Sequence, residues 1–171
     1  MDEFPDPVSD SVYLALQRFL YREASLLDAH RYDDWFTLLA PGVKYRITVP
    51  SVRDAAAGTV RVDIVVEDHA ALKTRVTQLG NPRLTRAENP QTLMRRSVTN
   101  IEAFELGGER LLVKSHLLAF RGPRAGNASA GFYSAGRQDI LSVSGDGFLI
   151  LEREVSLDHA VLEGGILSTL L

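Results

Sequence analysis

The sequence of 171 residues contains no cysteine. This absence excludes disulfides, thiolate nucleophiles, cysteine-ligated zinc and iron–sulfur clusters from the chain, so another polypeptide would have to supply such groups. Apolar runs are only a few residues long, far below the roughly 20 that span a bilayer. The first residues are acidic and proline-containing, without the basic and apolar regions of a secretory signal. We therefore expect a cytoplasmic protein with no membrane partner.

An excess of charge of either sign is also lacking. Lysine and arginine number 19 against 22 aspartates and glutamates, and the net charge is −3. Nucleic acid is therefore not an expected partner. Hydrophobic residues make up 45% of the chain, which is an ordinary globular composition. The length predicts a single domain over 1–171, with 1–8 as a flexible N-terminal arm.

Two helices are predicted in the first quarter of the chain. Apolar residues at steps of three and four predict a helix over 9–29, which Ser9 or Asp10 can cap. A second helical pattern covers 32–39, and Pro41-Gly42 is expected to end it.

The rest of the chain is dominated by strands. A period of two predicts a strand over 43–49, and a Val/Ile-rich segment predicts another over 60–67. Asp68 can cap a helix that extends to residue 79. Four further strands are predicted at 95–106, 109–121, 131–143 and 147–158. This order predicts an α+β domain, with N-terminal helices packed on a curved, mostly antiparallel sheet.

The strand at 109–121 carries apolar residues on both faces. Leu112, Leu118 and Phe120 alternate with an equally apolar set on the other side. Both sheet faces should therefore be covered, the second one by another subunit or by the C-terminal tail.

The histidines do not suggest a metal site. His30, His69, His116 and His159 are about forty residues apart, and no pair has the spacing of a compact site. We therefore expect neither a metal nor a cofactor in this chain.

Acid–base chemistry without a cofactor is an alternative. A cone-shaped domain can enclose a pocket in which a carboxylate or histidine lies beside a tyrosine. Tyr13, Tyr45, His116 and Asp139 are the candidate catalytic residues. The competing explanation is that they are core residues with satisfied hydrogen bonds.

The densest basic region of the sequence is a cluster of arginines around Asn89-Pro90. It consists of Arg83, Arg86, Arg95 and Arg96, with Asn89 between them. A solvated loop and a subunit interface both explain it, since arginine is enriched at interfaces.

Three blocks carry a family resemblance. The first runs from Phe19-Leu20-Tyr21-Arg22-Glu23-Ala24 to Tyr32-Asp33-Asp34-Trp35, and the second from Ala87-Glu88-Asn89-Pro90 to Ile101. The third comprises Arg137-Gln138-Asp139-Ile140-Leu141, Arg153, Leu157-Asp158 and the apolar residues 166–171. In this order the blocks resemble the small, or β, subunit of aromatic-ring-hydroxylating dioxygenases. Arg86 and Phe148 stand where that family commonly has tryptophan.

The resemblance implies an NTF2-like (cystatin-like) cone. It also implies a trimer of small subunits beneath three large subunits, in a hexamer for aromatic compound catabolism. The large subunit would hold a Rieske [2Fe-2S] cluster and a mononuclear iron, and this chain would be a structural, non-catalytic subunit. The alternatives are a stand-alone isomerase or dehydratase that uses the Tyr/Asp/His pocket, and a homotrimeric binding module.

Overall fold

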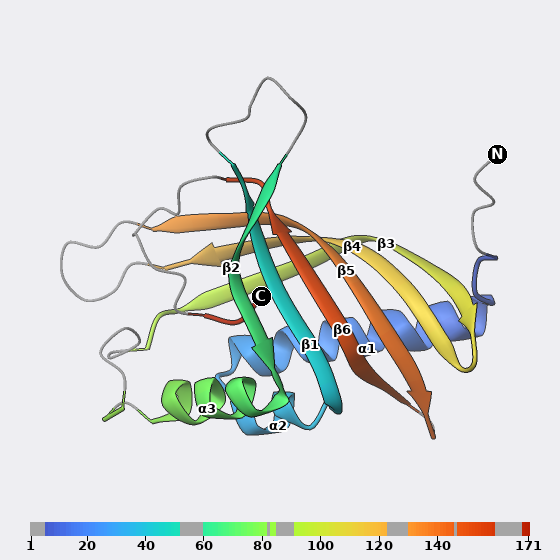
Figure 1. Ribbon diagram of the computed structural model, residues 1–171, viewed down its shortest axis with the longest axis horizontal. Coiled ribbons are helices and arrows are strands. Elements are labelled where there is room, and N and C mark those ends of the chain that lie inside the picture. Colours follow the sequence, from blue (N-terminus) through green and yellow to red (C-terminus); the bar gives the residue numbers. More distant parts are fainter. Residues whose placement is uncertain are drawn as a thin grey trace.

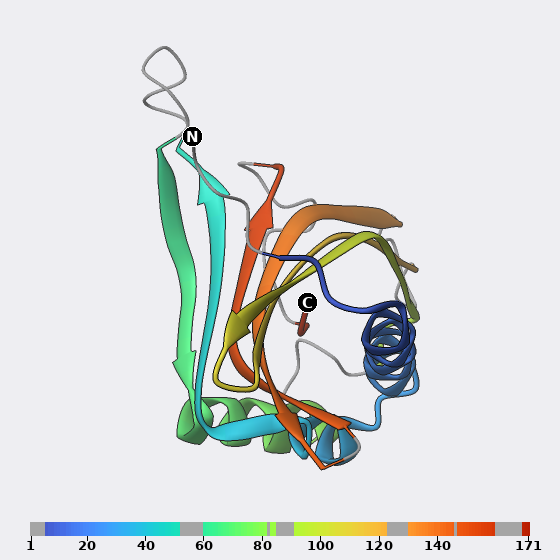
Figure 2. The same ribbon diagram turned by 90° about the vertical axis from the view of Figure 1, so that its right-hand side faces the viewer.

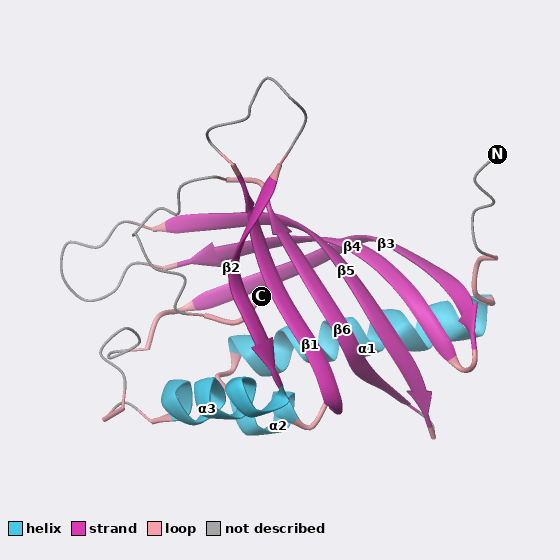
Figure 3. Cartoon of the chain, viewed as in Figure 1, coloured by secondary structure: helices cyan, strands magenta, loops and turns pink. Residues whose placement is uncertain are grey.

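The chain forms helices that pack against a six-stranded sheet (Figures 1 and 3). The computed structural model describes residues 6–51, 60–81, 83–84, 91–122, 130–145, 147–159 and 169–171. Within these ranges the elements are α1 (Asp10–Asp28), α2 (Tyr32–Phe36), β1 (Leu39–Pro50), β2 (Arg61–Asp68), α3 (His69–Gly80), β3 (Met94–Gly107), β4 (Arg110–Arg121), β5 (Gly131–Ser144) and β6 (Gly147–Leu157).

The strand order across the sheet is β2-β1-β6-β5-β4-β3. All neighbours are antiparallel except β1 and β6, which are parallel. The sheet curves around α1 and residues 169–171, and α2 and α3 close one end (Figure 2). We call the side that faces α1 the inner face and the opposite side the outer face. The predicted α+β architecture on a mostly antiparallel sheet is confirmed.

The helices begin where the sequence predicts. The Ser9 side chain accepts a hydrogen bond from the Val12 amide at 3.4 Å and caps α1. The Asp68 carboxylate accepts one from the Ala71 amide at 2.9 Å and caps α3. These side chains satisfy amides that have no partner within the helix. Both predicted helices, 9–29 and 69–79, are therefore confirmed to within a residue of their ends.

The second helix is shorter than predicted. It ends at Phe36 rather than at residue 39, and Leu39 already belongs to β1. Pro41 and Gly42 therefore lie inside a strand and do not end the helix. They fall where the register between β1 and β6 shifts, between Leu39 and Lys44. Such a bulge accommodates a proline because no ladder hydrogen bond needs its missing N–H.

The start of the described chain runs beside β3. Pro7 forms an isolated antiparallel bridge with Phe104. The Val8 amide donates to the Ala103 carbonyl at 3.1 Å, and the Glu105 amide donates to the Asp6 carbonyl at 2.9 Å. Asp6 and Val8 of the predicted arm over 1–8 are thus hydrogen-bonded to the sheet, and residues 1–5 lie outside the described ranges.

Residues 169–171 lie in the interior of the cone. Leu170 and Leu171 are 1% and 0% exposed and belong to the hydrophobic core. Residues 169–171 therefore fill the inner side and do not cover the outer face, and residues 160–168 of the tail lie outside the described ranges. In the described helices, none is both long and apolar enough to cross a membrane.

Candidate functional site

Four charged side chains meet in the interior of the cone. They are Glu23 on α1, Arg137 and Asp139 on β5, and Arg153 on β6, and all are at most 4% exposed. Glu23 lies on the buried stripe of α1, three residues after Leu20. The three strand residues occupy inward positions of their strands, where apolar residues would normally point.

Arg153 connects both carboxylates. Its Nη1 donates to Glu23 Oε1 at 2.5 Å, while its Nε and Nη2 donate to the two Asp139 oxygens at 2.8 and 2.9 Å. Such forked pairs suit the planar guanidinium, which presents its donors in fixed directions. Arg153 therefore joins α1, β5 and β6 at one point.

Further donors complete the cluster. Arg137 Nη1 donates to Glu23 Oε2 at 3.2 Å, and its Nε lies 3.4 Å from Asp139 Oδ2. The Trp35 indole N–H donates to Glu23 Oε1 at 2.8 Å. Two arginines thus balance two carboxylates, and α2 is tied to the same cluster through Trp35.

The electrostatics keep this cluster charged. Burial alone raises the pKa of Glu23, but Arg153 and Arg137 outweigh it and lower the pKa from 4.5 to about 2. Burial acts to lower the pKa of Arg153, yet Asp139 and Glu23 raise that pKa well above its ordinary value. Glu23 is therefore ionised at neutral pH and is already fully engaged, so it is poorly suited to transfer protons.

Tyr45 binds the C-terminal residues beside the cluster. Its hydroxyl donates to the Leu171 carbonyl and accepts from the Leu171 amide, both at 2.9 Å. Burial raises the pKa of this tyrosine, despite the hydrogen bond that its oxygen accepts from the Leu171 amide. The hydroxyl is therefore neutral and satisfied, and the tail occupies the space beside it.

The four predicted catalytic residues are not brought to one place. Tyr45 and Asp139 both lie inside the cone, but each is engaged by the partners described above. Tyr13 donates from its hydroxyl to the Ile101 carbonyl at 3.1 Å, between α1 and β3. His116 is exposed on the outer face of β4. The sheet therefore separates His116 from the two interior candidates.

The predicted arginine cluster is also divided. Arg86 and Asn89 lie outside the described ranges, and Arg83 is exposed in the turn after α3. Arg95 is exposed on β3. Arg96, its neighbour, points inward and binds Asp28 at 2.6 Å, the Leu170 carbonyl at 2.7 Å and Thr169 at 2.9 Å.

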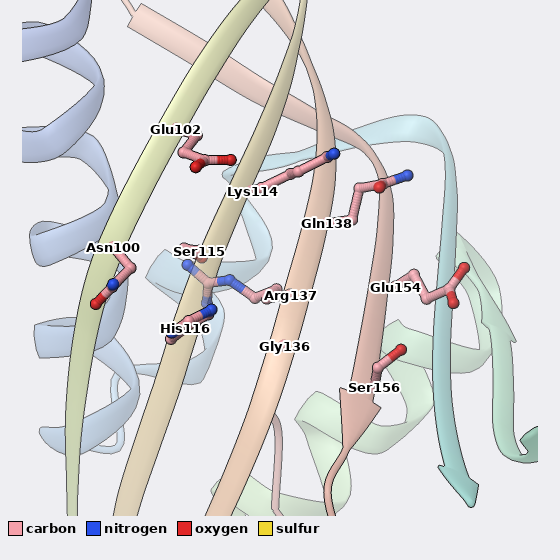
Figure 4. A pocket seen from close by; sticks show the side chains of 10 residues that line it. All are labelled: Asn100, Glu102, Lys114, Ser115, His116, Gly136, Arg137, Gln138, Glu154 and Ser156. Carbon is pink, nitrogen blue, oxygen red and sulfur yellow. The ribbon is translucent and has the colours of Figure 1, made fainter. Parts of the chain in front are cut away.

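The outer face carries a polar groove of about 430 Å³ (Figure 4). One row of opposed residues crosses six strands here, in the order Glu102, Lys114, Gln138, Glu154, Arg46 and Val66. A second row contains Thr99, His116, Gly136 and Ser156. The described helices cover the inner face only, so this groove is open.

A Rieske cluster does not fit the residues of this chain. It requires two cysteines and two histidines, and the sequence has no cysteine. Among the described residues, no three histidine, aspartate or glutamate side chains are grouped so that they could hold a metal ion. His116 shares the groove with Glu102 and Glu154, but these described side chains are not grouped closely enough to hold a metal ion.

The interior cluster was not predicted, although the sequence carries a signal for it. Glu23 interrupts the apolar stripe of Leu16, Leu20 and Leu27 at a position that periodicity assigns to the core. Arg137 and Arg153 likewise fall in step with inward apolar residues of their strands. A charged residue at a position that the apolar periodicity assigns to the core indicates a buried ion pair, because burying an unpaired charge would cost too much free energy.

Comparisons with known proteins agree with this architecture. Residues 22–164 match the model of a family described as the ring hydroxylating beta subunit. The 3-phenylpropionate/cinnamic acid dioxygenase subunit beta of Photorhabdus laumondii subsp. laumondii is 29% identical over 173 residues, which cover 95% of this chain and 93% of that protein.

Two solved structures are similar in fold. A chain of naphthalene 1,2-dioxygenase with indole bound in the active site has a TM-score of 0.82 and 23% identity, over 96% of this chain and 88% of that chain. The beta subunit of benzoate 1,2-dioxygenase from Burkholderia mallei has a TM-score of 0.67 and 22% identity, over 84% of this chain and 88% of that one. The predicted NTF2-like (cystatin-like) cone is confirmed.

Proposed function

This chain belongs to the ring-hydroxylating β-subunit family, and on that premise we propose that it is the structural, non-catalytic subunit of a Rieske-type aromatic-ring dioxygenase. It supports assembly with an iron-bearing large subunit in the terminal oxygenase, a cytoplasmic complex of aromatic compound catabolism. The small subunits form a trimer, and three large and three small subunits form a hexamer.

The observation that carries the non-catalytic role is the closed interior. Glu23 and Asp139 are both paired with arginines, and Leu171 occupies the space next to Tyr45. An enzyme with a cofactor-free acid–base pocket would need an accessible and unengaged acid or base there. The interior is instead built as a rigid core, which suits a subunit that holds others in place.

The Rieske cluster and the mononuclear iron are assigned to the large subunit. The donor set of this chain supports that assignment because it offers no thiolate for the cluster. When bound, the iron centres of the partner supply the oxygen chemistry. The residues of this chain contribute shape and contact surface to the complex.

Co-expression tests the proposal. The full chain with an affinity tag is produced together with the Rieske protein encoded beside it, and the purified material is analysed by light scattering, iron assay and visible spectroscopy. We expect a hexamer with the spectrum of a Rieske cluster and about three iron atoms per large subunit, two from the cluster and one mononuclear. The tagged chain expressed alone is the control and should carry no iron.

Failure to co-purify with the neighbouring Rieske protein contradicts the proposal. So does iron that remains with the isolated small subunit. A hexamer that dissociates into separate large and small subunits when the Glu23 cluster is disrupted agrees with it, because the proposed role depends on a rigid core.

A further inference from the structure

Residues 169–171, which we call the tail segment, lie inside the cone in the manner of a bound peptide (Figure 2). They are 6%, 1% and 0% exposed, and they belong to none of the described helices and strands. Their described hydrogen bonds to the rest of the chain go to two side chains, those of Tyr45 and Arg96. The segment can therefore leave its place without breaking a described hydrogen bond between strands.

Tyr45 and Arg96 bind mainly the peptide groups of the tail segment. The Tyr45 hydroxyl lies 2.9 Å from both the carbonyl oxygen and the amide nitrogen of Leu171, and it donates to the first and accepts from the second. Arg96 Nη2 donates to the Leu170 carbonyl at 2.7 Å and to the Thr169 hydroxyl at 2.9 Å. Carbonyl acceptors and an N–H donor are common to all short peptides and N-acylated amino-acid amides, so these contacts do not require the tail's own sequence.

The apolar surroundings decide which side chains the space accepts. Leu170 and Leu171 belong to the main hydrophobic cluster, together with residues of α1, β1 and β6. Branched aliphatic groups gain free energy from burial there, whereas a charged group would lose its hydration without gaining a partner. The space is therefore selective for uncharged molecules with aliphatic side chains.

A surface cleft shares Arg96 with this interior space. The cleft has a volume of about 310 Å³ between α1 and β3, and its lining includes Tyr21, Ser25, Asp28, Arg96 and Ser97. Arg96 thus borders the cleft and also binds the tail segment. Its Nε is buried without a hydrogen-bond partner among the described residues, so the tail segment does not use every donor of this side chain.

We propose that the space filled by the tail segment is a binding site for short aliphatic peptides and N-acylated amino-acid amides, and that the tail segment is its built-in occupant. The ligand is uncharged. Its amide pairs with Tyr45, a second carbonyl accepts from Arg96, and its branched side chains replace those of Leu170 and Leu171. The site is independent of the assembly proposed above, because all of its residues come from this chain.

The covalent link makes the tail segment a strong competitor for its own site. An occupant on the same chain acts at an effective concentration on the order of 1 mM. A free ligand that makes the same contacts therefore displaces it only near or above that concentration. A chain whose tail segment cannot enter the apolar space should bind the same ligand at far lower concentrations.

The double variant Leu170→Asp/Leu171→Asp of the full chain removes the occupant, because its carboxylates resist burial. The probe is N-acetyl-leucyl-leucine amide, and calorimetric titration measures its binding. We expect one probe to bind per variant chain, with a dissociation constant at least about tenfold lower than for the parent. Leu106→Asp/Val143→Asp carries the same changes at two exposed strand positions and should bind like the parent. A Leu170/Leu171 variant that binds the probe no better than the parent overturns the proposal.

Circular dichroism accompanies the titration, because loss of two buried leucines also weakens the fold. If the double variant is unfolded alone, saturating probe should restore the spectrum of the parent, since a ligand that binds only the folded state stabilises it. An unfolded variant that the probe does not restore also overturns the proposal.

A measurement on the parent chain needs no substitution. About 10 mM probe exceeds the effective concentration of the tail segment, so the Leu171 amide should lose Tyr45 and exchange its hydrogen faster, as followed by NMR. N-acetyl-alanyl-alanine amide has the same peptide groups without the branched side chains and should leave this exchange unchanged. Unchanged exchange with the leucine probe, or equal acceleration by both probes, contradicts the proposed site.

An ester analogue of the probe tests the hydrogen bond to Tyr45. Replacement of the N–H of its second leucine by an oxygen atom removes the donor to the tyrosine hydroxyl and keeps the shape of the ligand. We expect the ester to bind the double variant about tenfold more weakly than the amide. Equal binding of amide and ester would refute the recognition of a peptide group by Tyr45.

Discussion

Glu23 and Arg153 form an ion pair in which both side chains are fully buried, although 130 residues separate them in the sequence. The pair links the first helix to the last strand. Arg137 and the Trp35 indole also donate to the Glu23 carboxylate, and Asp139 also accepts from Arg153. Much of the fold therefore depends on a single electrostatic cluster.

Removal of one partner should destabilise the chain strongly. Glu23→Ala leaves two buried arginines against one carboxylate, and we expect a loss of about 3–5 kcal/mol in the free energy of unfolding. Urea denaturation followed by circular dichroism measures it. Glu102→Ala, at an exposed glutamate of the outer face, should change the same quantity by less than about 0.5 kcal/mol. Equal effects of the two changes would contradict a central role for the cluster.

The same carboxyl makes stability depend on pH. Its pKa is about 2 in the folded protein and 4.5 in the reference state, so the unfolded chain binds the proton more tightly. The ionised Glu23 carboxylate therefore stabilises the folded protein fully above pH 4.5. This stabilisation is lost as the pH falls toward 2, and the free energy of unfolding decreases by about 3 kcal/mol in all. Glu23→Gln should remove this part of the dependence. Unfolding free energies at pH 7, 4 and 3 measure it, and parallel profiles for parent and variant would refute the assignment.

Tyr45→Phe should loosen residues 169–171. The change deletes a hydroxyl that both donates to and accepts from Leu171, which leaves a buried amide and carbonyl without that partner. We expect a loss of about 1–3 kcal/mol in unfolding free energy and faster amide exchange at Leu171, measured by hydrogen exchange. Tyr21→Phe is the matched control, since its hydroxyl is at the surface and accepts only from Gln17 in the described contacts. Similar exchange at Leu171 in both variants would argue against the role of Tyr45.

The adjacent arginines Arg95 and Arg96 should differ in how much they contribute to the free energy of unfolding. Arg96→Ala removes contacts with Asp28, Thr169 and Leu170, and we expect it to cost about 3–5 kcal/mol because its side chain is only 1% exposed. Arg95→Ala should change the unfolding free energy of the monomer by less than about 0.5 kcal/mol. Thermal unfolding at low protein concentration compares them. A larger effect at Arg95 than at Arg96 would contradict the described orientation of β3.

The elements were largely predictable because each carries its own local signal. The cap at Ser9, the cap at Asp68 and the alternation along β4 locate their elements to within one or two residues. Pro41-Gly42 was misinterpreted, since the same residues that end helices also occupy bulges in strands. The bulge exists only because β1 meets β6, and that contact involves residues 108 positions apart, such as Thr48 and Ser156.

The candidate site was less predictable for the same reason. His116 and Asp139 looked equivalent in the sequence because both are polar residues on strands. Their difference depends on which face of the sheet each one occupies, and a step of one residue in register exchanges the faces. The pairing of Glu23 with Arg153 likewise needs the complete topology, since no local pattern connects α1 to β6.

The position of Leu170 and Leu171 inside the cone has a consequence for synthesis on the ribosome. These side chains complete a core whose other members begin at Leu16, so that core cannot be completed before residues 170 and 171 have been synthesised. Until then, the interior of the curved sheet lacks two of its buried leucine side chains.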